Sequence, residues 1–380
     1  MALTQRWIAI IKILVPDPAR AHHSDKKAAL FKTIEAGRGI AALLVVLYHA
    51  STTFRAAKYW HTRLFGGIFD IGYIGVEFFF VLSGFIILQV HADDIGKPRQ
   101  LRRYALKRFV RIYPVYWIVL AVIIILSMII GGLRYPLTLS LIAQSFSLIG
   151  PDEARVPLTA AWTLFHEIVF YIIFGVCIIN VRVGLLIITI WLLLVAGNIV
   201  GIYPEWMPAY ICAPVNLLFL FGAAAYWVAS RDLIPAPIIV AGAGALVFLG
   251  TAIEAEYVKR FSETTNTLTL GISAAIGLAA VVTLERRQKV TVSRFLLAAG
   301  AASYSIYLVH APLIAALSKL AMHSGLSGRL PTVLSFSVLV IVPSIIGYAF
   351  HRIVEQPLLR TISTRMSLGA RAAAVPQKLV

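Results

Sequence analysis

Two ionisable side chains interrupt one long apolar run of the sequence. Residues 34–50 read I-E-A-G-R-G-I-A-A-L-L-V-V-L-Y-H-A, with Arg38 and His49 eleven residues apart. At about 100° per residue, this spacing brings both onto one helix face, about 16 Å apart along the axis. Ionisable groups inside a bilayer are costly, so Arg38 is a candidate anion site and His49 a candidate base. The structural alternatives are a topology anchor for Arg38 and an interhelical hydrogen bond for His49.

A second apolar run carries a carboxylate near its middle. It reads G-Y-I-G-V-E-F-F-F-V-L-S-G-F over residues 72–85, and Glu77 falls halfway through a bilayer. A carboxylate at that depth needs a cation, or it stays neutral and donates a hydrogen bond. Glu77 is therefore expected to support the substrate or the structure. Ser83 is expected to be a packing or capping hydroxyl, because no G-x-S-x-G context surrounds it.

A basic segment follows, R-R-Y-A-L-K-R-F-V-R-I-Y-P at residues 102–114. Arg108 and Arg111 are three residues apart, hence on one face if the segment is helical. Guanidinium groups match the geometry of phosphate oxygens, so this pair is a candidate phosphate-binding site. A basic loop that sets topology and touches anionic lipid is an equally good interpretation of the spacing.

A carboxylate also occurs in A-A-W-T-L-F-H-E-I-V-F-Y, residues 160–171. If this run enters the membrane from the outside, Glu167 lies at the depth of His49. A carboxylate beside a histidine base orients the imidazole and stabilises its cation. Glu167 is therefore expected to assist His49, and a structural ion pair is the alternative.

Near the C-terminus, S-Y-S-I-Y-L-V-H ends at His310, with Tyr307 three residues earlier. These two side chains are expected to help hold an oxyanion or the acceptor. The segment V-E-Q-P follows, and its Glu355 is available to pair with the basic segments. The histidines are scattered without a tight ligand pair, so neither a metal site nor a permanently bound cofactor is expected.

The composition is that of a membrane protein. Hydrophobic residues make up 59% of the 380 residues, charged residues 13%, and the mean hydropathy is +0.85. A soluble domain carries about 45–50% apolar and about 25% charged residues, so the composition argues against a soluble enzyme or a disordered chain. Long apolar runs without short alternating strands predict an all-α polytopic membrane protein. Cys177 and Cys212 lie in such runs and are expected to be small core residues.

About ten transmembrane helices are predicted, because ten runs approach the roughly 20 residues that cross the hydrocarbon layer. They lie near 33–53, 68–90, 113–131, 161–180, 183–200, 209–229, 234–252, 268–284, 295–318 and 331–351. The apolar stretch 137–149 is too short for a span and is expected to be re-entrant or interfacial.

The basic residues predict that both termini are cytoplasmic. With the N-terminus inside, 24 Lys and Arg residues fall on the inner side and 9 on the outer side, as the positive-inside rule requires. We expect a cytoplasmic basic segment at 1–32 with an interfacial helix over Arg6–Val15, a transmembrane domain at 33–357 and a cytoplasmic basic tail at 358–380. The net charge of +17 then reflects contact with membrane lipid, and no nucleic-acid partner is expected.

Six of these segments together resemble the acyltransferase-3 family of bacterial membrane O-acyltransferases, and most of all the rhizobial exopolysaccharide acetyltransferases. They are R-G-I-A-A-L-L-V-V-L-Y-H, G-V-E-F-F-F-V-L-S-G-F, K-R-F-V-R-I-Y-P, W-T-L-F-H-E-I-V-F-Y, S-Y-S-I-Y-L-V-H and V-E-Q-P. Each segment alone is a weak signal, but their order makes the resemblance specific. Family members often have Asp where this chain has Glu77.

The resemblance implies a ten-span fold in a bacterial inner membrane and transfer of an acyl group, usually acetyl, from acyl-CoA to a sugar hydroxyl. The implied acceptor is a polysaccharide or a lipid-linked oligosaccharide, and polysaccharide-synthesis proteins are possible partners. The Arg–ten residues–His pattern of the family falls on Arg38 and His49. Its Arg-x-x-Arg pattern falls on Arg108 and Arg111, and its acid falls on Glu167.

The expected mechanism follows from these assignments. Arg108, Arg111 and Arg38 hold the phosphates of coenzyme A at the cytoplasmic face, and the acyl-pantetheine arm reaches along the bundle. His49 removes the proton of the acceptor hydroxyl, helped by Glu167; direct transfer and a transient acyl-histidine both remain open. The rival is a transporter or flippase for a lipid-linked sugar or anion. Its inverted repeats or paired broken helices are not apparent in the sequence.

Overall fold

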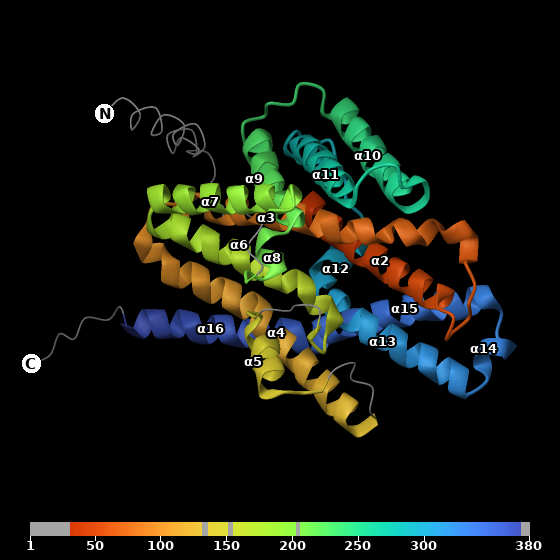
Figure 1. Ribbon diagram of the computed structural model, residues 1–380. Coiled ribbons are helices and arrows are strands. Elements are labelled where there is room, and N and C mark those ends of the chain that lie inside the picture. The colour runs from red at the N-terminus through yellow and green to blue at the C-terminus, as the bar shows by residue number, and fades with distance from the viewer. Residues whose placement is uncertain (1–30, 131–135, 151–154, 203–205, 374–380) are drawn as a thin grey trace, which may run out of the picture.

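The computed structural model describes residues 31–130, 136–150, 155–202 and 206–373 (Figure 1). The expected interfacial helix over Arg6–Val15 lies outside these residues. Helices make up most of the described chain, and no β-strand is assigned within it. Among the described residues, nine helical segments are long and apolar enough to cross a membrane. The prediction of an all-α, multi-pass membrane protein is confirmed.

The nine candidate spans correspond to nine of the ten predicted runs. They are Lys32–Arg55, Leu64–Asp94, Pro98–Ile129, Thr159–Ile179, Val181–Ile199, Pro237–Val258, Glu263–Arg286, Ser303–His323 and Thr332–Thr364. The tenth predicted run, 209–229, contains a shorter apolar helix, Pro214–Ser230.

The helices carry the labels of Figure 1. They are α2 (Lys32–Arg55), η2 (Leu64–Tyr73), α3 (Ile74–His91), η3 (Ala92–Asp94), η4 (Pro98–Gln100), α4 (Leu101–Ile130), α5 (Leu139–Ser147), η6 (Thr159–Ala161), α6 (Trp162–Ile179), α7 (Val181–Ile199), α8 (Ala209–Cys212), η7 (Pro214–Asn216), α9 (Leu217–Ser230), α10 (Pro237–Ile253), η8 (Glu254–Val258), α11 (Glu263–Arg286), α12 (Arg294–Ala301), α13 (Ser303–His323), α14 (Leu326–Arg329), α15 (Thr332–Phe350), η9 (His351–Glu355) and α16 (Gln356–Ala373).

The short helix α9 is built into the bundle like the longer spans. A Cβ atom on Gly84 of α3 would lie 1.9 Å from the carbonyl oxygen of Phe219, and one on Gly222 of α9 would lie 1.9 Å from that of Val81. Small residues let two membrane helices approach backbone to backbone in this way. At the end of α9, the Ala229 carbonyl accepts a hydrogen bond from Arg286, the last residue of α11. α9 is therefore an integral part of the bundle, although it is shorter than the nine candidate spans.

The bundle has two ends that differ in their polar residues. The near end is defined by Lys32, His91 and Glu285, and the far end by Arg55, Asp70 and Glu256. At the near end, Glu285 of α11 accepts hydrogen bonds from the backbone N–H groups of Lys32 (2.8 Å) and Thr33 (2.9 Å). Because the first N–H groups of a helix lack partners within it, this carboxylate stabilises the start of α2. Which end faces the cytoplasm stays a prediction.

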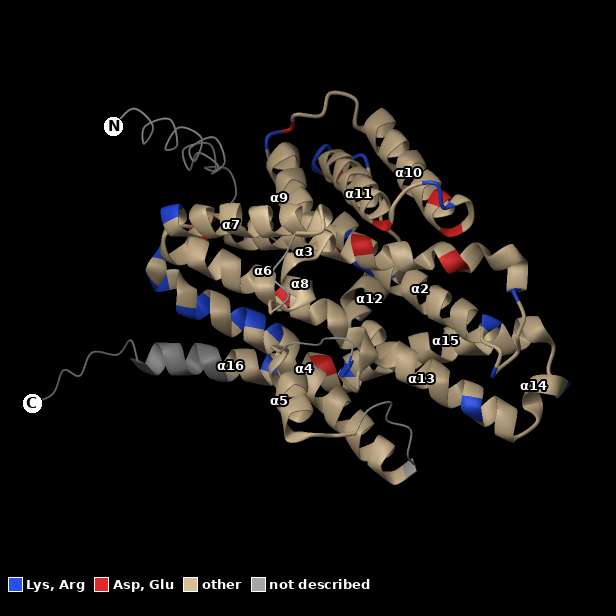
Figure 2. Cartoon of the chain, in the orientation of Figure 1, with Lys and Arg blue, Asp and Glu red and all other residues tan. Residues whose placement is uncertain are grey.

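The third span begins earlier than the sequence predicted. The expected span 113–131 left Arg108 and Arg111 in a loop, but α4 is continuous from Leu101 to Ile130 with Pro114 inside it. Proline is tolerated within transmembrane helices because neighbouring groups satisfy the freed carbonyl. The two arginines therefore lie on one helix, and Figure 2 shows basic residues along its first turns.

The last spans also differ in detail from the predicted runs. The run 295–318 is divided into α12 and α13 at Ala302. The last span continues through the π-helical turn η9 into α16, so that residues 358–373 of the expected tail are helical.

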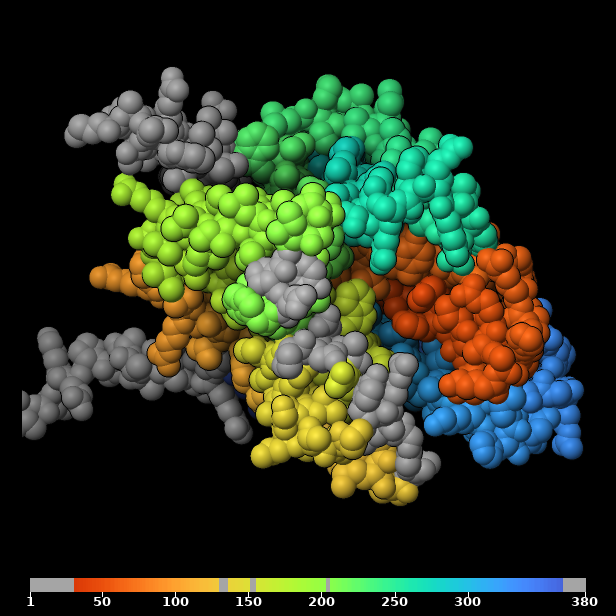
Figure 3. All heavy atoms as spheres, in the orientation of Figure 1, coloured from red at the N-terminus to blue at the C-terminus, as the bar shows by residue number. Residues whose placement is uncertain are grey.

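The first span lies among the last ones. α2 packs against α12, α13 and α15, and Figure 3 shows the N-terminal helices against the C-terminal ones. A Cβ atom on Gly39 would lie 2.8 Å from the carbonyl oxygen of Leu296, and one on Gly300 would lie 1.9 Å from that of Glu35. This close approach of α2 to α12 fixes the part of α2 that carries Arg38.

Candidate functional site

A cavity toward the near end of the bundle gathers most of the predicted polar residues. We call it the near cavity. Its polar lining consists of Arg38, Ser83, Arg108, Arg111, Thr163, Glu167, Tyr171, Ser303, Tyr304 and Tyr307. Its apolar lining consists of Val76, Phe79, Phe80, Ile86, Ile112, Leu164 and Phe219. Residues from six helices, α2, α3, α4, α6, α9 and α13, thus meet around three guanidinium groups and one carboxylate.

Arg38 is the predicted anion site in this cavity. It shares the lining of the cavity with Arg111 and Glu167. No hydrogen bond or ion pair joins its side chain to another residue in the described part of the chain. A half-buried guanidinium that lines a cavity without a direct carboxylate partner is suited to bind an anionic ligand.

Arg108 is held by a histidine rather than by an acid. Its Nη2 lies 3.0 Å from Nε2 of His91, the last residue of α3. His91 is buried, and its Nδ1 lies 2.6 Å from Oδ2 of Asp94 in η3. The guanidinium carbon of Arg108 lies 5.5 Å from the ring centre of Tyr171. Asp94, His91 and Tyr171 thus fix the fork of Arg108 at the rim of the near cavity.

Arg111 is held by a carboxylate. Its Nη1 donates to Glu355 Oε1 at 2.8 Å. Glu355 is completely buried, and its Oε2 also meets Ser305 Oγ at 2.7 Å and His351 Nδ1 at 2.8 Å. Glu355 lies in the π-helical turn η9, a type of distortion that is frequent at functional sites. The expectation that Glu355 pairs with a basic segment is confirmed.

Glu167 lies on α6 with Tyr171 one turn later, and the Tyr171 hydroxyl donates to its Oε1. The Tyr104 hydroxyl of α4 in turn donates to the Tyr171 carbonyl at 2.9 Å. Glu167 therefore faces the near cavity with the arginines. No contact joins it to His49 within the described residues, because His49 lines a different cavity.

The second cavity, which we call the far cavity, opens beside the end of α2. It is lined by His49, Thr52, Thr53, Ala56, Lys58, Tyr59, Ala311, Ile314 and Ala315. Lys58 and Tyr59 adjoin each other at its rim, with the Lys58 Nζ 5.1 Å from the ring centre of Tyr59. The small side chains of Ala311 and Ala315 on α13 leave room in front of the His49 imidazole.

A row of rings runs from the lining of the far cavity to the lining of the near cavity. The ring of His49 lies 5.0 Å from that of His310, and the ring of His310 lies 5.7 Å from that of Tyr307. The Tyr307 hydroxyl is 3.0 Å from that of Thr163, and both line the near cavity. His310 is completely buried, and its Nδ1 donates to the Ile306 carbonyl at 3.2 Å. Its Nε2 has no hydrogen-bond partner, so it is available as an acceptor beside His49.

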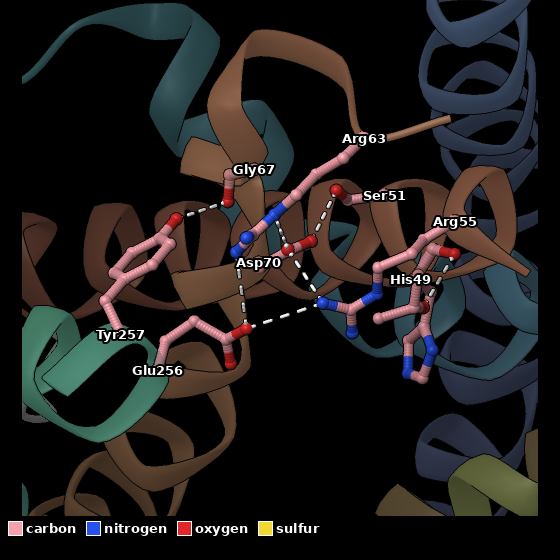
Figure 4. Close-up of polar contacts among 9 residues, drawn as sticks. His49, Ser51, Arg55, Arg63, Gly67, Asp70, Glu256 and Tyr257 are labelled. Carbon is pink, nitrogen blue, oxygen red and sulfur yellow. Dashed lines mark hydrogen bonds and ion pairs between the residues drawn. The ribbon is translucent and has the colours of Figure 1, made fainter. Parts of the chain in front are cut away.

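A charge cluster at the far end holds the last turns of α2 in place (Figure 4). The buried Asp70 accepts from Ser51 Oγ at 2.6 Å and from Arg55 Nη1 at 3.1 Å, and it pairs with Arg63 Nε at 3.3 Å. Glu256 lies 3.5 Å from Arg55 Nη1. Figure 4 shows the His49 ring pointing away from this cluster. The cluster therefore positions the helix that carries His49 without occupying the imidazole.

Two other ionisable residues, Glu77 and His166, line neither cavity. Glu77 is not among the lining residues of either, and its buried Oε2 has no hydrogen-bond partner. His166 is buried and donates from Nδ1 to Asn216 Oδ1 at 2.8 Å, so it links α6 to η7. In the part of the chain that the structure describes, no group of three or more His, Cys, Asp and Glu side chains could hold a metal ion.

Sequence reasoning missed three contributors to this region. His91 and Asp94 lie where the second span ends and carry no motif that links them to α4. Tyr304 lies in the segment S-Y-S-I-Y-L-V-H, but no role was predicted for it; it lines the near cavity, and the guanidinium carbon of Arg111 lies 5.3 Å from its ring centre. The basic segment at 102–114 was the signal that could have prompted a search for their partners.

Comparison with known proteins identifies the family of the chain. A model of the acyltransferase domain of the acyltransferase-3 family matches residues 31–351. The exopolysaccharide production protein ExoZ of Rhizobium meliloti is 30% identical over 326 residues, which cover 81% of this chain and 97% of that protein.

Two further relatives match over shorter regions. The peptidoglycan O-acetyltransferase OatA of Listeria monocytogenes is 26% identical over 156 residues, 37% of this chain and 23% of that protein. Protein 2 in the picA locus of Rhizobium radiobacter is 27% identical over 159 residues, 37% of this chain and 78% of that protein. No solved structure matches. The resemblance predicted from the six segments is confirmed, and the chain belongs to the acyltransferase-3 family of membrane O-acyltransferases.

Proposed function

We propose that this membrane O-acyltransferase takes an acyl group, most simply acetyl, from cytoplasmic acyl-CoA. The acceptor in this proposal is a hydroxyl of a cell-surface or exported polysaccharide, or of its lipid-linked precursor. One observation carries the proposal: a single helix, α2, presents Arg38 to the near cavity and His49 to the far cavity. An anion site and a base site then serve the two substrates from opposite ends.

The near cavity is the proposed donor site. Coenzyme A carries phosphate groups, which guanidinium groups bind well, and Arg38 lines this cavity without a direct carboxylate partner. Beyond the arginines, the lining includes Phe79, Phe80 and Leu164, which suits the thioester end of the pantetheine arm. Because acyl-CoA is a cytoplasmic metabolite, the near end would face the cytoplasm of a bacterial inner membrane, in agreement with the positive-inside bias of the sequence.

The far cavity is the proposed acceptor site. A sugar hydroxyl that enters past Tyr59 would meet His49, which takes its proton as the oxygen attacks the thioester carbon. The new ester forms as the carbon–sulfur bond breaks, and the proton passes from His49 to the departing thiolate. His310 lies beside His49 with a free Nε2, so it can hold the imidazole or the hydroxyl in place.

Glu167 receives a different role in this proposal than the sequence suggested. It lines the near cavity together with Arg38, and it accepts a hydrogen bond from the Tyr171 hydroxyl. We assign it to positioning the donor rather than to contact with His49. Tyr307 lies between the cavities and is the proposed donor of a hydrogen bond to the thioester oxygen.

Coenzyme A release from acetyl-CoA tests this function. Purified protein in nanodiscs is assayed with and without a crude cell-envelope polysaccharide fraction. Acceptor-dependent release is expected, and His49→Ala should lower it by about 10²–10⁴-fold, the usual contribution of a general base. His323→Ala, which removes an exposed histidine at the far end, is the matched control and should leave the rate unchanged. Unaltered transfer by folded His49→Ala protein would remove the base from the mechanism.

The same assay separates acyl transfer from the transporter alternative. A transporter or flippase would bind its lipid-linked sugar without consuming acyl-CoA. The family assignment favours acyl transfer. If protein with an intact fold neither binds acetyl-CoA nor releases coenzyme A from it, that result would favour the transporter alternative.

A further inference from the structure

The hydrogen bonds around Arg108 have one consistent direction. A guanidinium can only donate, so the 3.0 Å contact with Arg108 makes His91 Nε2 the acceptor. His91 Nδ1 then carries the ring proton and donates it to Asp94 Oδ2 at 2.6 Å. Asp94 thus fixes the tautomer of a neutral imidazole, and that imidazole fixes one nitrogen of Arg108.

The two arginines of the Arg-x-x-Arg pair therefore meet partners of different charge. Arg108 is bound to a neutral ring and keeps its full positive charge at the near cavity. Arg111 donates to the carboxylate of Glu355, which is completely buried, so the two charges largely cancel. Glu355 also binds Ser305 of α13. Through Glu355, Arg111 therefore links α4 to η9 and α13.

Arg108 also has an unused donor. Its Nε is buried and has no hydrogen-bond partner, although buried N–H groups nearly always have one. The guanidinium carbon lies over the Tyr171 ring, 5.5 Å from its centre. With Nη2 bound to His91 and the Tyr171 ring beside the group, the remaining N–H groups have little freedom. An anionic ligand in the near cavity, which Arg108 lines, would supply the missing acceptor.

We propose that His91, oriented by Asp94, is a positioning residue that presents Arg108 to a phosphate group of the acyl donor. In this proposal Arg108 is the anion-binding member of the pair, and Arg111 is the structural one. The inference rests on the proposed function, because it takes a phosphorylated thioester as the ligand of the near cavity.

Two donors that differ only in phosphate content test the inference. Kinetics of thiol release are measured for the full chain in nanodiscs with acetyl-CoA and with S-acetylpantetheine, which has the same thioester and no phosphate. His91→Leu should raise the KM for acetyl-CoA about tenfold, or ~1.4 kcal/mol, in line with a weakened hydrogen bond to a charged group. The kcat of His91→Leu with acetyl-CoA should stay within about twofold of wild type, and so should its kcat and KM with S-acetylpantetheine.

Two further variants keep the test decisive if His91→Leu does not fold. Asp94→Asn removes the charge that fixes the His91 tautomer, at a side chain that is 19% exposed, and should raise the same KM less. His91→Gln offers an amide oxygen to Arg108 and should restore part of the affinity. Arg102→Gln removes an exposed positive charge from the same helix, six residues before Arg108, and should change neither donor.

Several outcomes would overturn the inference. An equal rise in KM for both donors would mean that His91 only supports the fold. Wild-type KM values for acetyl-CoA in folded His91→Leu and Asp94→Asn would mean that Arg108 needs no such support. Failure of the proposed function gives a different result, because the wild type itself then neither binds nor consumes acetyl-CoA. If wild type and variants turn over acetyl-CoA alike, only the inference about His91 fails.

Discussion

The ion pair between Arg111 and Glu355 should respond unequally when it is broken from its two sides. Arg111→Met leaves a completely buried carboxylate with only Ser305 and His351 as donors. Glu355→Gln leaves a guanidinium that is 30% exposed, still facing an amide oxygen and able to reach water. The burial of Glu355, rather than the number of lost contacts, therefore decides which variant is worse.

The expected magnitudes follow from that difference in burial. Breaking a buried pair typically costs about 3–5 kcal/mol. Because Ser305 and His351 still donate to Glu355, we expect Arg111→Met to lower the free energy of unfolding by about 2–4 kcal/mol. Glu355→Gln should lower it by about 1–2 kcal/mol. The double variant Arg111→Met/Glu355→Leu buries neither charge. It should therefore cost less than its two single variants together, with a coupling of about 1–3 kcal/mol.

Denaturant titration of the purified protein in mixed micelles measures these differences. Wild type, Arg111→Met, Glu355→Leu and the double variant form the cycle, and Glu355→Gln is measured beside them. Arg102→Met, at an exposed position of the same helix, controls for loss of an arginine and should stay within about 0.5 kcal/mol of wild type. Equal losses for Arg111→Met and Glu355→Gln, or additivity within about 0.5 kcal/mol, would refute the reasoning.

Three further variants test other parts of the fold and site. Gly84→Leu should abolish folded, monodisperse protein because its Cβ would lie 1.9 Å from the Phe219 carbonyl, whereas Gly242→Ala meets no atom within 4 Å and should leave the melting temperature unchanged or higher. Glu285→Ala removes the acceptor at the start of α2 and should cost about 1 kcal/mol in the same titration; wild-type stability would contradict that role. Ala311→Leu narrows the far cavity and should raise the KM for the polysaccharide acceptor but not for acetyl-CoA; the opposite pattern would place the acceptor elsewhere.

The membrane spans were predictable from the sequence because they depend on hydropathy and length alone. The errors arose where local residues obscured a helix. The predicted span began at residue 113, after most of the basic segment, but α4 begins at Leu101 and includes Arg108. The run 209–229 contains only a short helix because α8 and η7 precede it, and Asn216 of η7 binds the carbonyls of Tyr210 and Ile211.

The candidate site was predictable in its residue types and only partly in its geometry. Periodicity placed Arg38 and His49 on one helix, and α2 is continuous through both. Depth alone also suggested that Glu167 reaches His49, but depth says nothing about the direction in which a side chain points around its helix. His49 instead lies beside His310, 5.0 Å between ring centres. Partners of this kind come from different helices and leave no spacing signal in one sequence.

The placement of the two cavities would protect the thioester of the proposed donor from water. A thioester in contact with water can be lost to hydrolysis, so an enzyme that joins substrates from two aqueous sides gains from a barrier between them. The rings of His49, His310 and Tyr307 form a continuous row at centre distances of 5.0 and 5.7 Å. The same row includes the proposed base. In the proposed mechanism, the acceptor hydroxyl at His49 and the acyl carbon of the donor would therefore have to meet at this row of rings.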